Sequence, residues 1–199
     1  MCESRPIAGG LWLGDSVIVV LAIDPGIRSP GAALFADRQL VAATRIKVPA
    51  AVHVRALGDR VMTVAKLING WYQALCWSKG GGITHELVYE WPQIYRTSRS
   101  KGDPNALLKT LAVGVAASAL VMADRNYTPN PDEWAGQTKK STTGDPWESQ
   151  RGQMIARRLT DAEKALVPRS HDALDAVGLG LWRVGRFEPI RVYPGASPG

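Results

Sequence analysis

The chain has 199 residues, enough for one domain of ordinary size with a substantial core. Lys and Arg number 24 against 18 Asp and Glu, and the net charge of +6 indicates a polyanionic partner, with nucleic acid as the first candidate. A hydrophobic share of 45% and a charged share of 21% exclude a disordered tail protein. Because no apolar run is long enough to span a bilayer, we expect no membrane partner.

The two cysteines, Cys2 and Cys76, form neither a disulfide framework nor a zinc-ligand spacing. They indicate a reducing cytoplasm. The apolar stretch near the start of the chain runs into Asp24 and Pro25, where a secretory signal would need small residues for cleavage. We therefore expect no signal peptide.

The first part of the chain predicts a three-stranded meander. Residues 17–24 are β-branched and apolar on both faces, which is typical of a central strand covered on both sides, and Pro25 and Gly26 end it. Residues 32–36 and 39–48 are predicted strands, joined by a tight turn at Asp37 and Arg38.

Helices and short strands alternate in the rest of the chain. Apolar residues at helical spacing predict a helix over 53–77, ended by Lys and Gly at 79–82, and residues 86–90 predict a strand stopped by Trp91 and Pro92. Asp103 as cap and Pro104 at the first helical position open a helix to about residue 124. A short strand at 127–128, a Pro- and Gly-containing connection through 146, helices over 147–159 and 171–184, and a tail over 185–199 follow. The pattern predicts an α/β domain with a five-stranded mixed sheet and helices on both faces.

Four acidic residues stand where a carboxylate is costly. Asp24 and Glu90 end two predicted strands, and adjacent strand ends in an open α/β sheet are where ligands usually bind. Asp172 and Asp175 lie three residues apart on one face of the last helix, among Ala, Leu and Val that imply burial. Each acid also has a structural interpretation: Asp24 as a turn residue, Glu90 as an exposed strand end, and Asp172 as a favourable charge at a helix start. Asp175, deeper in an apolar helix, is the hardest to explain in this way.

If the four carboxylates converge, their repulsion would destabilise the fold unless a cation lies among them. Mg²⁺ prefers a few carboxylates together with water and phosphate oxygens. Two such ions about 4 Å apart can activate a water and stabilise a leaving 3′ oxygen. The pattern therefore indicates a nuclease.

Four features together resemble RuvC-type Holliday junction resolvases over about residues 17–184: Ile23-Asp24-Pro25-Gly26 after a β-branched strand, Glu90 closing a later strand, the Lys-, Ala- and Gly-bearing helix over 103–117, and His-Asp-Ala-Leu-Asp-Ala at 171–176. The resemblance implies an RNase H-like fold, a homodimer, and Mg²⁺-dependent paired nicking of a four-way DNA junction, with Mn²⁺ as a substitute and no small-molecule cofactor. Asp24, Glu90, Asp172 and Asp175 match the family's catalytic and metal-binding acids, and are called the acidic tetrad below. The implied location is the cytoplasm or nucleoid of a bacterial or phage-infected cell.

The chain departs from the family pattern at two places. Glu148 precedes Ser149-Gln150, where bacterial members have a basic residue, and Lys139 and Lys140 are candidate replacements for its DNA contact. Trp91-Pro92 and Tyr95 follow Glu90 in place of the usual residues, and Tyr95 is the candidate aromatic wedge near the crossover. Such departures are expected of a divergent member, for which a phage is one candidate source.

Basic residues gather after Glu90. Arg96, Arg99 and Lys101 lie in a predicted loop without an acid, and we expect them to contact phosphates. Residues 94–158 carry ten Lys and Arg against six Asp and Glu, which is most of the net charge. His171 is interpreted as a capping or surface histidine, and packing is favoured over base stacking for Trp91 and Trp134.

Other functions compete with a strict resolvase. A broader debranching or flap nuclease stays open, as does a noncatalytic RNase H-like DNA-binding module, although the complete set of four acids disfavours the latter. The length of the chain and the lack of a second Asp-Pro-Gly pattern downstream argue against an ATPase of the actin and sugar-kinase kind. We expect dimerisation through the helix over 104–124, whose small residues allow close approach: Gly114, Ala116, Ala117 and Ser118.

Overall fold

The computed structural model describes residues 17–75, 82–91, 104–135 and 144–186. Its strands form one sheet in the order β3-β2-β1-β4-β5. They are β1 (Val17–Asp24), β2 (Gly31–Ala36), β3 (Gln39–Arg45), β4 (Ile83–Tyr89) and β5 (Arg125–Tyr127). β1 pairs antiparallel with β2 and parallel with β4, while β2 pairs antiparallel with β3 and β4 parallel with β5. The predicted α/β class with a five-stranded mixed sheet is confirmed.

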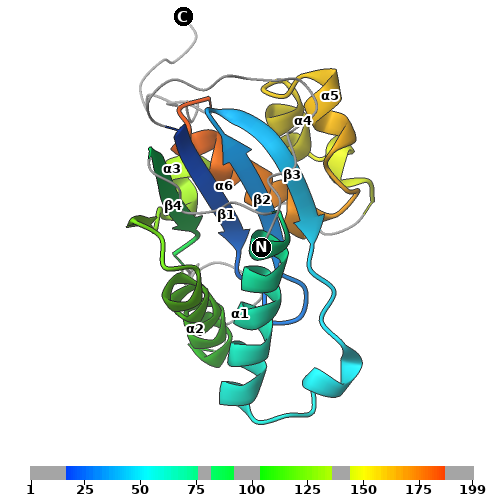
Figure 1. The fold of residues 1–199 in the computed structure, drawn as a ribbon. Coiled ribbons are helices and arrows are strands. Elements are labelled where there is room, and N and C mark those ends of the chain that lie inside the picture. The colour runs from blue at the N-terminus through cyan, green and yellow to red at the C-terminus, as the bar shows by residue number, and fades with distance from the viewer. Residues whose placement is uncertain (1–16, 76–81, 92–103, 136–143, 187–199) are drawn as a thin grey trace, which may run out of the picture.

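Helices cover both faces of the sheet (Figure 1). On one face lie α1 (Leu57–Ala74) and α2 (Pro104–Val121). On the other lie α3 (Pro131–Trp134), α4 (Gln150–Ala156) and α6 (His171–Arg183), while α5 (Asp161–Ala165) lies beside β3. Two 3-10 turns, η1 (Ala50–Val52) and η2 (Pro146–Glu148), complete the described elements, none of whose helices could cross a membrane.

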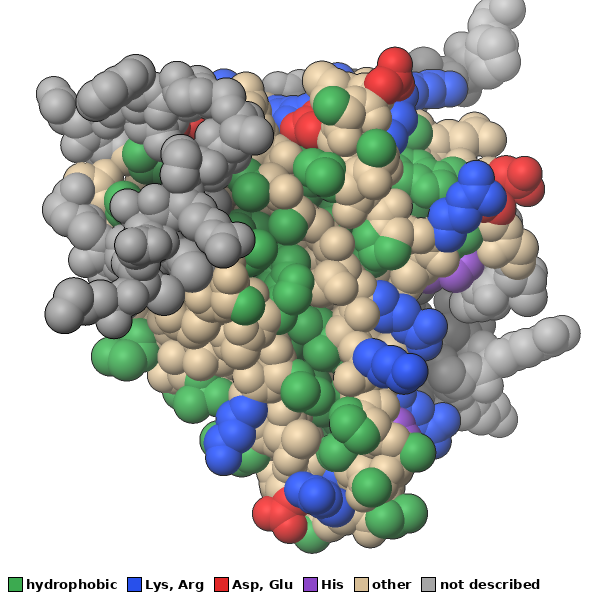
Figure 2. Space-filling view, turned by 45° about the vertical axis from the view of Figure 1, so that its right-hand side comes forward, with side chains coloured by type: hydrophobic (Ala, Val, Ile, Leu, Met, Phe, Trp, Pro, Cys, Tyr) green, Lys and Arg blue, Asp and Glu red, His purple; other side chains and the backbone are tan. Residues whose placement is uncertain are grey.

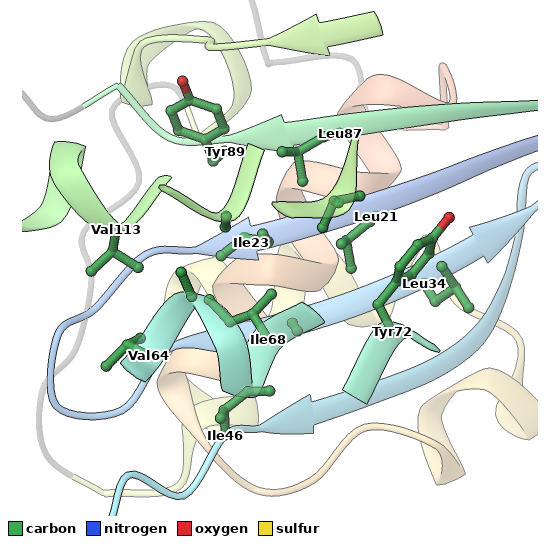
Figure 3. Packing of buried hydrophobic residues seen from close by; sticks show 14 of the residues in the cluster. Leu21, Ile23, Leu34, Ile46, Val64, Ile68, Tyr72, Leu87, Tyr89 and Val113 are labelled. Carbon is green, nitrogen blue, oxygen red and sulfur yellow. The ribbon is translucent and has the colours of Figure 1, made fainter. Parts of the chain in front are cut away.

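β1 is the centre of both cores. Its odd-numbered residues, such as Leu21 and Ile23, pack toward α1 and α2, and Figure 3 shows both beside Ile68 of α1. Its even-numbered residues Val20 and Ala22 pack toward α6. All four are at most 1% exposed, and burying a large aliphatic side chain contributes about 1.5–3 kcal/mol. The apolar run in the sequence is thus explained by two-sided burial.

Several predicted boundaries were wrong by a few residues. β3 ends at Arg45 instead of residue 48, and α1 begins at Leu57 instead of 53, because the chain forms the η1 turn and leaves Val54 88% exposed. β4 begins at Ile83, three residues early, and ends one residue before Glu90. β5 begins at 125 instead of 127, and α2 ends at residue 121 instead of about 124.

The segment after β5 contains two short helices that the prediction omitted. Asn130 and Glu133 form a capping box around Pro131 at the start of α3, and Thr160 and Glu163 form another at the start of α5. The single helix predicted over 147–159 is divided into η2 and α4. The final helix, predicted over 171–184, is confirmed as α6 to within one residue.

Two of the small residues of α2 that were expected at a dimer contact, Gly114 and Ala117, face the sheet instead. A Cβ at Gly114 would lie 2.4 Å from the Tyr89 ring, and Ala117 is fully buried in the core. These residues therefore serve the close approach of α2 to β4. The apolar side chains that α2 and its end expose are instead Leu108, Val115 and Met122, at 60%, 51% and 69%.

Candidate active site

Asp24 and Glu90 lie side by side at one edge of the sheet. Ile23 pairs with Tyr89 in the parallel ladder of β1 and β4. The residues that follow them are Asp24 and Glu90, which therefore lie next to each other. Successive strand residues point to opposite faces. Because Ala22 and Val88 both pack toward α6, Asp24 and Glu90 are placed on that same face.

The first turn of α6 lies against the start of β2. Gly31 pairs with Asp24 across the sheet, and a Cβ at Gly31 would lie 1.8 Å from the carbonyl oxygen of Asp172. Only glycine permits so close an approach of helix and strand. α6 thereby brings Asp172 and Asp175 to the edge of the sheet that holds Asp24 and Glu90.

Asp172 is held from the β2 and β3 side of this edge. Its Oδ2 accepts a hydrogen bond from Ser29 Oγ at 2.7 Å and lies 3.4 Å from Arg45 Nε. The Asp172 side chain is 30% exposed and that of Arg45 is 58% exposed. This carboxylate is therefore both oriented and reachable from solvent.

Asp175 is 3% exposed and is held from the other side. Arg151 Nη1 of α4 donates to its Oδ1 at 3.2 Å, and the Arg151 side chain is 13% exposed. Burying a carboxylate is costly unless it pairs with a cation or accepts several hydrogen bonds. Arg151 supplies that cation.

A chain of contacts links Asp175 to Glu90. The Arg151 guanidinium lies 5.0 Å from the ring centroid of Trp134, which is completely buried. Trp134 Nε1 in turn donates to Glu90 Oε2 at 3.1 Å. One arginine and one indole thus connect the carboxylate after β4 with the carboxylate of α6.

The tetrad suits a hard divalent cation by the chemistry of its donors, since carboxylate oxygens are ligands that Mg²⁺ prefers. In the described parts of the chain, however, no three His, Cys, Asp or Glu side chains are grouped closely enough to hold a metal ion. Glu90, Asp172 and Asp175 each accept a protein hydrogen bond or ion pair instead. The residue types fit Mg²⁺, and the structure shows the carboxylates held by protein donors.

Sequence reasoning missed the residues that hold the tetrad: Ser29, Arg45, Trp134 in this role, and Arg151. The only available signal was that Arg151 follows the Ser149-Gln150 pair. His171 is the first residue of α6, directly after the N-cap Ser170, and is partly buried, whereas Trp91 is 44% exposed. The predicted DNA contacts Tyr95, Arg96, Arg99, Lys101, Lys139 and Lys140 lie outside the described residues.

The five-stranded mixed sheet with helices on both faces is an RNase H-like α/β fold. Comparison with solved structures gives RuvC from Thermus thermophilus, at 16% identity and a TM-score of 0.52, over 86% of this chain and 99% of that one. The same protein in complex with a Holliday junction substrate matches with a TM-score of 0.49 and 16% identity, over 87% and 99%. No family model and no curated protein matches. The chain has a RuvC-like fold.

Proposed function

We propose that this protein is a metal-dependent endonuclease that resolves four-way DNA junctions by paired phosphodiester hydrolysis. The observation that supports the proposal is that Asp24 and Glu90 follow paired residues of β1 and β4, while the Asp172 backbone of α6 packs on Gly31, which pairs with Asp24. The RuvC-like fold supports it. In this role the protein would serve DNA recombination and repair.

Asp24, Glu90, Asp172 and Asp175 would hold Mg²⁺, with two ions per site and Mn²⁺ as a substitute. When bound, such ions supply Lewis-acid stabilisation of the phosphate and a water of lowered pKa. The surrounding residues prepare the carboxylates. Ser29 and Arg45 orient Asp172, Trp134 orients Glu90, and Arg151 pairs with the buried Asp175.

Branched DNA is the proposed substrate. The net charge of +6 supports a polyanionic partner, and binding should weaken steeply with salt. We assign the protein to the cytoplasm or nucleoid of a bacterial or phage-infected cell, with support from the two cysteines and the DNA substrate.

We further propose a homodimer, because paired nicks on opposite strands of a junction require two active sites. The support comes from the apolar stripe of Leu108, Val115 and Met122, which recurs every seven residues along the exposed side of α2 and its end. Residues at this spacing lie on one side of a helix and suit contact with a second helix. A second copy of α2, related by a two-fold axis, would cover the stripe.

The conservative variants Asp24→Asn, Glu90→Gln, Asp172→Asn and Asp175→Asn test the nuclease assignment. Each removes a charge without changing the size of the side chain, so we expect cleavage to fall by at least 10³-fold, about 4 kcal/mol of transition-state stabilisation. Junction binding, measured without a divalent cation, should be retained. A loss of binding that matches the loss of cleavage would mean that the acids serve the fold and would contradict the proposal.

A further inference from the structure

A cavity of about 370 Å³ opens beside Asp172 on the side of the β3 end. It lies between the end of β3, the start of α6 and the segment before η2. Its walls come from Arg45, Gly144, Pro146, Arg169, Ser170, His171 and Asp172. The cavity therefore borders the candidate active site without including Asp24, Glu90 or Asp175.

Two arginines line this cavity with most of their hydrogen-bond donors to spare. Arg45 Nε lies 3.4 Å from Asp172 Oδ2, and Arg169 Nη1 lies 3.3 Å from Asp145 Oδ2. A guanidinium has five N–H donors, so each ion pair leaves further donors for a ligand. The Arg45 and Arg169 side chains are 58% and 80% exposed, so each can turn toward a ligand in the cavity without leaving a buried position.

His171 adds an unsatisfied donor or acceptor. Its Nε2 is buried and has no hydrogen-bond partner within the part of the chain that the structure describes. A buried polar atom without a partner is costly, and rotation of the ring toward the cavity would bring this nitrogen to a ligand oxygen.

The start of α6 also favours an anion. Ser170 has the extended backbone of an N-cap, with φ −144° and ψ 134°, but its side chain makes no capping hydrogen bond. The first N–H groups of a helix carry a partial positive charge and attract oxyanions. Asp145 and Asp172 balance the two arginines in formal charge, so the preference for an anion comes from the surplus of oriented N–H donors.

Further basic side chains gather on one side of the molecule. After Arg45, Ile46 and Val48 are buried, whereas Lys47 between them is exposed. Figure 1 places this segment at the lower right, the side that comes forward in Figure 2, where Lys and Arg side chains form a column with no acidic side chain between them.

We propose that the cavity beside Asp172 binds a backbone phosphate of the DNA substrate, with Arg45, Arg169 and His171 as its donors. This inference rests on the proposed function and adds a positioning site to it. A phosphate held here fixes the strand relative to the tetrad. Arg45 would connect the two sites, because it also contacts Asp172.

Arg169→Gln tests the inference, with Arg157→Gln as the matched control. Both remove one exposed positive charge, and Arg157 lies at the end of α4, away from this cavity. Binding of a synthetic four-way junction would be measured without a divalent cation at several salt concentrations. We expect Arg169→Gln to weaken binding five- to tenfold and to lower the salt dependence by about one phosphate contact. The control should change affinity less than twofold.

A neutral methylphosphonate placed singly along the strands near the crossover identifies the phosphate. One position should weaken binding of the wild type but not of Arg169→Gln, since the contact is already absent from that variant. Equal affinities of Arg169→Gln and Arg157→Gln would overturn the inference.

Free phosphate is the other source of the same chemistry. If inorganic phosphate shifts the His171 imidazole resonance while Arg169→Gln leaves junction binding unchanged, the cavity takes a free anion and the DNA assignment is overturned. If the wild type binds no junction, both this inference and the proposed function fail. If it binds through Arg169 but the tetrad variants show no loss of cleavage, only the proposed function fails.

Discussion

Arg151 Nη1 lies 3.2 Å from Asp175 Oδ1, and the two side chains are only 13% and 5% exposed. The pair joins α4 to α6 and holds the Asp175 carboxylate from the α4 side. An ion pair this enclosed is strongly coupled, because removing one partner leaves a charge in a poorly solvated place. Arg151 therefore bears on both the stability of the fold and the ability of Asp175 to bind a cation.

Replacing Arg151 with glutamine should lower the free energy of unfolding by about 3 kcal/mol, because Asp175 stays buried without its cation. Urea denaturation measures the change. Added Mg²⁺ should stabilise the variant more than the wild type, since the ion can take over the neutralisation of Asp175. Lys164→Gln, which breaks the exposed pair with Asp161, is the control and should cost far less, because solvent screens an exposed pair. A variant as stable as the wild type would show that Asp175 does not depend on Arg151.

Trp134→Phe should separate packing from the orientation of Glu90. Phenylalanine keeps most of the buried ring but cannot donate to Glu90 Oε2, so we expect a cost of about 1–3 kcal/mol in unfolding free energy. Cleavage should fall by more than tenfold while junction binding is unchanged, because the misplaced group acts only in catalysis. Trp182→Phe, in the same apolar cluster, should reduce stability without this loss of cleavage. Equal cleavage by both variants would mean that the indole N–H has no role in the site.

The Glu163 carboxylate predicts a specific acid sensitivity. Burial raises its pKa, but hydrogen bonds and charge from Arg186, with backbone N–H donors of Leu40 and Thr160, outweigh burial and lower the pKa to about 2. A depressed folded-state pKa gives stability that is present above the unfolded value of 4.5 and is lost as the pH falls toward 2. The shift corresponds to about 3 kcal/mol.

Glu163→Gln should therefore be less stable than the wild type at pH 7, and the difference should disappear between pH 4.5 and 2. Urea titrations at several pH values measure this. A difference that is constant with pH would place the effect of Glu163 in packing instead of in its charge.

The apolar stripe of α2 predicts where the subunits meet. Val115→Glu should convert a dimer to a monomer in sedimentation at micromolar concentration, because a charge would be buried against the second copy. Val54→Glu, at a residue 88% exposed on the η1 side, is the matched control and should leave the dimer intact. A wild-type monomer at this concentration would contradict the proposed pairing of active sites.

The sequence was sufficient to predict the sheet and the place of its acids. β1 is recognisable because β-branched residues on both faces leave few alternatives to a central strand. The position of Asp24 at the end of this strand follows from the same pattern. α6 is recognisable from Ser170 and from the acids set in an apolar helix. These features are local, so the sequence carries them directly.

Contacts between distant segments could not be predicted in the same way. In the sequence, Arg151 is one basic residue among many, and its role depends on the packing of α4 against α6. Arg45 is likewise only the end of a strand, and its role depends on the position of Asp172, which Ser29 also contacts. The burial of Gly114 depends on which side of α2 faces Tyr89. The helix is weakly amphipathic, so its sequence does not indicate which side is buried. The capping boxes at Asn130 and Thr160, by contrast, are local signals that were visible and were missed.

The most direct test of the central claim is cleavage of a synthetic four-way junction in Mg²⁺, beside linear duplex, flap and three-way substrates, with Asp24→Asn as the control. The account predicts symmetric nicks near the crossover of the four-way junction, absent from the variant and from the linear duplex. Equal cutting of flaps and three-way branches would contradict junction resolution and assign a general debranching nuclease. Tight junction binding by the wild type with no cutting of any substrate would contradict the nuclease assignment itself.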